Sequence, residues 1–122
     1  MAQIHSNPDN KCPWCLGDPL MEAYHDREWG IPVTTDHGMF EHLVLEGFQS
    51  GLSWRTVLHK REAFHAALHG FDAGSLLRFT DAEREAFLAN PQVIRNRLKL
   101  EAALHNARTL VAFRDRHGKG FA

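Results

Sequence analysis

The segment from Glu46 to Trp54 places a carboxylate and a large aromatic ring on either side of a predicted bend. Glu46 follows an apolar stretch with helical spacing, and Gly47 and Gly51 come after it. Ser53 is a residue type that caps helices, so Trp54 falls in the first turn of a new helix. The apolar neighbours of Glu46 predict a partly desolvated carboxylate that needs a partner. The alternatives are a glutamate on a helix surface or one bonded to a nearby backbone amide.

Aromatic side chains gather in and before this bend. The three tryptophans are Trp14, Trp29 and Trp54, and the one tyrosine is Tyr24. Large aromatic residues most often belong to a core. Aromatic rings that enclose a flat ligand are also what a nucleobase needs once it has left the duplex, because stacking on protein replaces the stacking that it has lost.

Cys12 and Cys15 form a C-x-x-C pair, and His25 follows at a short distance along the chain. In a reducing compartment this spacing favours a pair of metal ligands or a redox motif over a structural disulfide. A structural zinc ion takes four ligands, so these three residues need one more from elsewhere. The alternative is a buried thiol pair with a hydrogen-bonded histidine.

Three cations, Arg95, Arg97 and Lys99, alternate with neutral residues just after Asn90-Pro91, where the last predicted helix begins. A helix N-terminus presents free amides to a phosphate. Taken alone, the segment reads as a solvated run of charge. Net charge is −1, so any contact with nucleic acid depends on a local patch such as this one.

The chain predicts an all-α protein, since no stretch has the alternation of a useful strand. Predicted helices cover about 19–29, a segment capped by Asp36 that runs through Gly47, a segment from Ser53 to a stop at Gly70, Asp72 to Leu77, Thr80 to about Ala89, and about Arg97 to Phe113. Asp18 is the predicted cap of the first helix, and Thr80 with Glu83 is a predicted capping box. Residues 1–11 read as a flexible arm, 12–117 as one helical domain, and 118–122 as a linker-like end. No run is apolar and long enough for a membrane span, and no secretion signal is found, which favours the cytoplasm.

Six ordered strings carry a family resemblance that extends from about Lys11 to Arg114. They are Asp18-Pro19-Leu20, Tyr24-His25-Asp26, Glu28-Trp29-Gly30, Leu45-Glu46-Gly47, Gly51-Leu52-Ser53-Trp54 and Ile94-Arg95-Asn96-Arg97. Together they resemble the 3-methyladenine DNA glycosylase I family of the helix-hairpin-helix superfamily. The resemblance implies an all-α helix-hairpin-helix glycosylase fold. Family members continue well beyond position 122, so we expect a chain that lacks the C-terminal part of that fold.

The resemblance implies hydrolysis of the N-glycosidic bond of 3-methyladenine in double-stranded alkylated DNA. Methylation at N3 leaves the base cationic and already a good leaving group, so recognition matters more than acid catalysis. Glu46 is then the acid that recognises the base, Tyr24 and Trp54 stack on it, and Trp14 lies nearby. Trp29 is interpreted as structural. Cation–π attraction adds selectivity for the charged base.

The same resemblance implies a structural zinc ion held by Cys12 and His25, with two further ligands from a C-terminal segment outside this chain. We therefore expect the half site in this chain to stay empty; the alternative is a makeshift site completed by Cys15 and a histidine such as His117. It also assigns the segment of Arg95, Arg97 and Lys99 to a DNA-backbone hairpin, and we expect a monomer. Two other classes of function remain open. One is a non-catalytic helical fragment that binds DNA, free base or a partner without turnover, and the other is a small zinc-structured interaction module.

Overall fold

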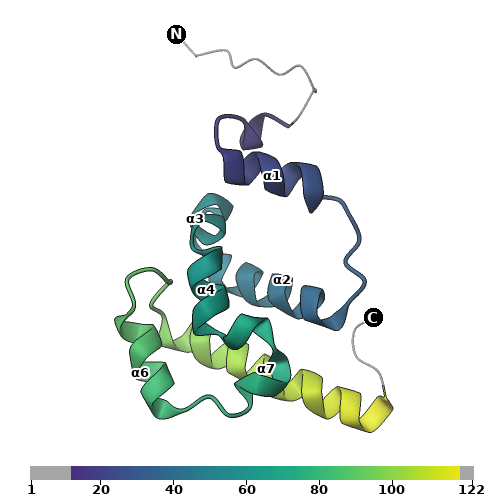
Figure 1. Ribbon diagram of the computed structural model, residues 1–122, viewed down its shortest axis with the longest axis vertical. Helices are drawn as coiled ribbons and strands as arrows, with labels where there is room; N and C mark the ends of the chain where they lie inside the picture. Colours follow the sequence, from purple (N-terminus) through teal and green to yellow (C-terminus); the bar gives the residue numbers. More distant parts are fainter. Residues whose placement is uncertain (1–11, 119–122) are drawn as a thin grey trace. The chain divides into compact units, whose positions relative to one another are not determined.

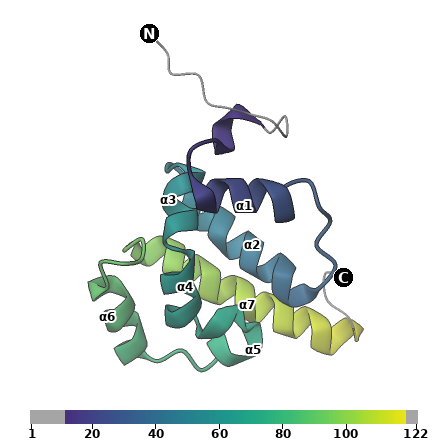
Figure 2. The same ribbon diagram turned by 45° about the horizontal axis from the view of Figure 1, so that its top comes forward.

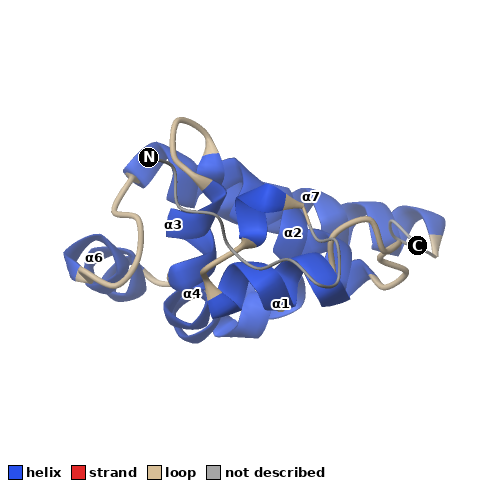
Figure 3. Cartoon of the chain, turned by 90° about the horizontal axis from the view of Figure 1, so that it is seen from above, coloured by secondary structure: helices blue, strands red, loops and turns tan. Residues whose placement is uncertain are grey.

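The computed structural model describes residues 12–118, and every regular element in that range is helical (Figure 3). The predicted all-α class is therefore confirmed for this part of the chain. The structure consists of two compact units, Met1–Pro32 and Val33–Ala122. The predicted arm, residues 1–11, and most of the predicted linker-like end, residues 119–122, lie outside the described range. None of the described helices is long and apolar enough to cross a membrane.

The first unit contains a short 3-10 turn, η1 (Pro13–Cys15), and helix α1 (Pro19–Arg27). Asp18 caps α1 as predicted, because its carboxylate accepts hydrogen bonds from the amides of Leu20 and Met21. The helix ends a little before the predicted limit of residue 29. The amides of Glu28 and Trp29 both donate to the carbonyl of Tyr24, which closes the last turn.

The second unit holds the remaining elements (Figure 1), and their buried side chains form a continuous apolar core. The elements are α2 (Asp36–Gln49), α3 (Trp54–His59), α4 (Arg61–Ala67), η2 (His69–Phe71), α5 (Ala73–Leu76), α6 (Asp81–Ala89) and α7 (Arg97–His117). Helices α2 and α7 lie side by side, and α5 packs on α7 (Figures 1 and 2). Phe48, Phe64 and Phe87 form a buried aromatic group in the core, with ring centroids 4.8 to 6.1 Å apart.

Side-chain caps fix where most of these helices begin. Ser53 caps α3 as predicted, and Thr80 with Glu83 forms the predicted capping box of α6. Asp72, where the fourth helix was predicted to start, is the cap of α5. One predicted cap is wrong, because Asp36 is already inside α2 and the cap is Thr35, whose hydroxyl accepts from the amide of Gly38 at 3.1 Å.

Two predicted helix lengths are also wrong. The segment after Ser53 is not one helix, because it breaks at Lys60, whose amide closes a short turn on the carbonyl of Val57 at 3.0 Å. The last helix continues past Phe113 to His117 and ends at Gly118, which takes the left-handed conformation at φ 71°.

The corner between α4 and α5 contains three successive residues with positive φ, at 53° for His69, 65° for Gly70 and 60° for Phe71. Only glycine adopts this conformation freely, and for other residues it costs on the order of 1–3 kcal/mol. Burial of Phe71 offsets part of that cost. The ring of His69 offsets more, because it bonds the hydroxyl of Ser75 at 2.8 Å and the carboxylate of Glu83. The corner therefore joins α5 and α6 through polar contacts.

Candidate functional site

Four rings of the first unit form a cluster on η1, on α1 and on the turn that follows α1. Trp14 lies 6.2 Å from Tyr24, 5.5 Å from His25 and 5.7 Å from Trp29, measured between ring centroids. Trp29 stacks on His25 at 5.4 Å with an interplanar angle of 16°. Trp14 is 39% exposed and Trp29 is 50% exposed, so the rings contact one another without being buried. Aromatic faces that remain accessible can accept a flat ligand.

The carboxylate of Glu46 is held on the last turn of α2, in the second unit, and its side chain is exposed. The predicted desolvation of Glu46 is therefore wrong for this structure. Helical periodicity explains the difference: α2 buries Val44, Leu45 and Phe48 on one face, and this turns position 46 outward. Gly47 is exposed beside it, with open space where a side chain would begin.

The bend after Glu46 is shaped by hydrogen bonds. The amide of Leu52 donates to the carbonyl of Gln49 at 2.7 Å, and the Gln49 side-chain amide donates back to the carbonyl of Leu52 at 2.7 Å. The hydroxyl of Ser53 then accepts from the amide of Thr56 at 3.2 Å and starts α3. Trp54, the first residue of α3, packs against the core. A fixed bend thus carries Glu46 on one side and Trp54 on the other.

The predicted base-recognising residues are therefore divided between the units. Trp14 and Tyr24 come together in the first unit, and Glu46 and Trp54 flank one bend in the second.

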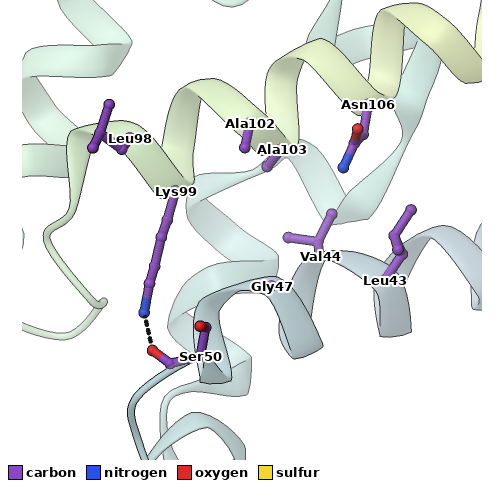
Figure 4. A pocket seen from close by; sticks show the side chains of 9 residues that line it. All are labelled: Leu43, Val44, Gly47, Ser50, Leu98, Lys99, Ala102, Ala103 and Asn106. Carbon is purple, nitrogen blue, oxygen red and sulfur yellow. Dashed lines mark hydrogen bonds between the residues drawn. The ribbon is translucent and has the colours of Figure 1, made fainter.

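A groove of about 250 Å³ lies between α2 and α7 in the second unit (Figure 4). Its walls are mostly apolar, and it is lined by Leu43, Val44, Gly47, Ser50, Leu98, Lys99, Ala102, Ala103 and Asn106. The sequence reasoning missed this groove. The available signal was the pair of small residues Ala102 and Ala103, which leave room opposite an exposed glycine on α2.

The predicted basic segment does not form a uniform row of cations. Arg95 is exposed, and Arg97 makes a long ion pair of 3.5 Å with Glu85 in which both side chains are exposed. Lys99 differs, because its ammonium donates to the carbonyl of Phe48 at 2.9 Å and to that of Ser50 at 2.6 Å. Its side chain reaches back to the end of α2, a contact that spacing along the sequence cannot reveal. The structure thus gives the ammonium of Lys99 partners within the protein, whereas the predicted phosphate contact stays a prediction.

The described residues do not fit a closed zinc site. No three histidine, cysteine or acidic side chains within residues 12–118 are grouped so that they could hold a metal ion. Cys15 is buried, and its thiol donates to the carbonyl of Cys12 at 3.1 Å. Nδ1 of His25 lies 3.2 Å from a carboxylate oxygen of Asp26. Cys12 and His25 would supply two of the four ligands that a structural zinc ion needs.

A polar cluster that the sequence did not predict joins His69, Ser75 and Glu83. The carboxylate of Glu83 accepts from Nε2 of His69, and Nδ1 of the same ring lies 2.8 Å from the hydroxyl of Ser75. The pKa of Glu83 is lowered, first by the hydrogen bond from the amide of Thr80 and then by that from His69. The capping box was visible in the sequence, but the part that His69 plays in it was not. The cluster stabilises the α4–α5–α6 corner.

Comparisons of the sequence with known proteins agree on one family. The family model described as methyladenine glycosylase matches residues 14–121. DNA-3-methyladenine glycosylase 1 of Escherichia coli (strain K12) is 40% identical over 111 residues, which cover 91% of this chain and 59% of the relative. The chain thus spans less than two thirds of the length of that relative.

Solved structures agree with the sequence comparison. A crystal structure of 3-methyladenine DNA glycosylase I superposes with a TM-score of 0.84 at 43% identity, over 91% of this chain and 60% of the other. A tyrosine-to-phenylalanine variant of such an enzyme, in complex with 3-methyladenine, gives a TM-score of 0.83 at 30% identity over 90% and 59%. A glutamate-to-glutamine variant from Staphylococcus aureus gives 0.82 at 30% identity over 90% and 59%. The aromatic cluster, the Glu46 bend and these matches lead to one conclusion: the chain belongs to the methyladenine glycosylase family.

Proposed function

We propose that this chain recognises 3-methyladenine as part of a DNA-3-methyladenine glycosylase, which hydrolyses the N-glycosidic bond of that base in alkylated double-stranded DNA. One observation carries the assignment of residues. The tyrosine and the glutamate substituted in the two solved variants are separated along their chains by the same number of residues as Tyr24 and Glu46. Family membership and the position of Glu46 beside an ordered bend support the same assignment.

The proposed reaction leaves a modest chemical task to the protein. Water adds to C1′ of the deoxyribose and gives up a proton to the solvent, the bond from C1′ to the base nitrogen breaks, and its electron pair neutralises the cationic base. Glu46 accepts hydrogen bonds from the base and favours its positive charge. Its exposure leaves the carboxylate accessible to a ligand. Glu46 therefore acts as a recognition group whose attraction is greatest for a charged base.

Aromatic rings supply the second part of recognition. We assign Tyr24 and Trp54 to stacking on the base, with Trp14 supporting Tyr24. Stacking of a base on an aromatic side chain is worth about 1–3 kcal/mol. A cationic base gains further from the negative face of the ring. Trp29 has a different role, because it stacks on His25 and contacts Trp14, so it holds the cluster in place.

For contact with the DNA backbone we propose Arg95 and Arg97, at the turn between α6 and α7, as a helix-hairpin-helix element. Exposed ion pairs contribute little to the stability of a protein, so a phosphate can replace Glu85 as the partner of Arg97. We expect Arg95→Ala and Arg97→Ala each to reduce the slope of log affinity against log salt by about one unit. Affinity for the free base should not change. A slope equal to that of the unaltered chain would show that these residues do not contact phosphate.

We further propose that the protein acts as a monomer in the cytoplasm and that this chain alone does not retain zinc. The poor fit of Cys12 and His25 to a four-ligand site supports the second statement. Elemental analysis after dialysis against a mild chelator tests it. Zinc close to one ion per chain would overturn it.

The central test of the proposed function is release of the base. DNA carrying radiolabelled methyl groups is incubated with the chain, and free 3-methyladenine is separated by chromatography. Release that falls in Glu46→Gln supports the glycosylase. The other candidate is a chain that binds DNA or base without turnover, and binding with no release would favour it.

A further inference from the structure

We propose that Lys99 is a positioning residue for base recognition: its ammonium fixes the end of α2 so that Glu46 and Trp54 are correctly placed. This inference rests on the proposed function. It assigns to Lys99 no contact with the base and none with DNA. The argument starts from the two carbonyl groups that Lys99 binds.

The ammonium of Lys99 meets the C-terminal end of α2. It donates to the carbonyl of Phe48 at 2.9 Å and to the carbonyl of Ser50 at 2.6 Å; Figure 4 draws Lys99 reaching Ser50 from α7. The last carbonyls of a helix have no partner in the next turn, and Ser50 has already left helical geometry at ψ 118°. A cation at this place satisfies the carbonyls and complements the negative end of the helix dipole.

The position of Lys99 in its own helix makes this contact more informative. Lys99 lies in the first turn of α7, where the helix dipole disfavours a positive charge. That turn, which lies wholly within the described residues, contains no acidic side chain to balance the charge. The side chain of Asn96 accepts from the amide of Lys99 at 3.0 Å and fixes the backbone from which the lysine extends. A positive charge at this position is unfavourable for helix α7 itself. It is favourable for the carbonyls at the end of α2, and we take these to be the reason for the lysine.

The two bonds act between the proposed recognition residues. Glu46 precedes Phe48 by half a turn of helix, and Trp54 begins the helix that follows Ser50. The bonds between Gln49 and Leu52 shape the bend locally. Lys99 attaches that bend to α7, which is anchored in the core by Leu100 and Leu104. Loss of Lys99 should therefore displace Glu46 and Trp54 while the core remains intact.

The experiment compares Lys99→Met with a matched control. Lys60→Met also removes a lysine that donates to a backbone carbonyl, that of Pro91 at 3.3 Å, which lies outside the bend. Affinity for free 3-methyladenine is measured by tryptophan fluorescence at a temperature where circular dichroism shows each variant folded. We expect Lys99→Met to bind about tenfold more weakly, since misplacement by an ångström can cost up to about 100-fold. Lys60→Met should stay within about twofold, and Lys99→Arg should recover most of the loss because it keeps the charge and the donors.

A purely structural role for Lys99 would lower the melting temperature but leave the affinity of the folded variant unchanged. That result would overturn the proposal. If Lys99→Met does not fold, Lys99→Gln takes its place with the same expected loss.

Hydrogen exchange at the amide of Leu52 provides a second readout. The exchange rate should be higher in Lys99→Met and unchanged in Lys60→Met. If the unaltered chain fails to bind the base, the proposed function fails. Exchange at Leu52 still decides the role of Lys99, and equal rates in all variants would refute it.

Discussion

The first unit and the second unit hold their aromatic side chains in different ways. In the first unit, Trp14 and Trp29 contact neighbouring rings and remain 39% and 50% exposed. In the second, Phe48 and Phe64 are buried, and Trp54 packs against their core. Rings of the first kind leave aromatic surface accessible, whereas the buried rings fill the hydrophobic core of the second unit. Substitution of an exposed ring in the first unit should therefore change recognition of the base, whereas substitution of a buried phenylalanine in the second unit should change stability.

The largest expected effect is on the stability of the second unit. Phe64→Ala should lower the free energy of unfolding by about 3–5 kcal/mol, because it opens a cavity beside Phe48 and Phe87. Chemical denaturation followed by circular dichroism measures the change. A loss below about 1 kcal/mol, the size expected for a surface site, would contradict the description of this core.

A substitution in the first unit should have the opposite profile. Tyr24→Leu should weaken binding of 3-methyladenine by about 1–3 kcal/mol through lost stacking. Its effect on the denaturation midpoint should be small, because Tyr24 is not among the buried core residues. Fluorescence titration and a melting curve on the same sample give both values. A variant that is much less stable but binds the base as before would reverse the comparison.

A smaller effect concerns the acid range. The pKa of Glu83 is lower in the folded protein than its ordinary value of 4.5, first through the bond from the Thr80 amide and then through His69. The stability that these bonds supply is present above the ordinary pKa and is lost as pH falls through the lowered, folded-state pKa. Melting temperature should therefore decline below about pH 4.5 more steeply in the unaltered chain than in Glu83→Gln. Parallel curves would show that Glu83 does not contribute.

Sequence patterns predicted the features of the fold that depend on neighbours along the chain. The capping box of Thr80 and Glu83 and the caps Asp18 and Ser53 are local, and all of them are found. Helical periodicity could also have shown that burial of Val44, Leu45 and Phe48 turns Glu46 to the surface. The apolar neighbours of Glu46 in the sequence suggested the reverse.

Contacts between segments that are far apart in the sequence could not be predicted from local sequence patterns. The hydrogen bonds of Lys99 could not be predicted, because their acceptors, the carbonyls of Phe48 and Ser50, lie at the end of another helix. His69 gave no pattern because its partners Ser75 and Glu83 meet only after the corner at Gly70 has formed. The break at Lys60 was missed because the residues around it all suit a helix.

Titration of 3-methyladenine into the chain and into Glu46→Gln tests the central claim most directly. Glu46 is exposed, so the substitution should leave the melting temperature unchanged. Loss of a charge-assisted hydrogen bond should weaken binding by about 1.5–3 kcal/mol, which is roughly a tenfold to hundredfold change in Kd. Equal affinity in the two proteins, both folded, would contradict the account, because Glu46 would then have no part in recognising the base.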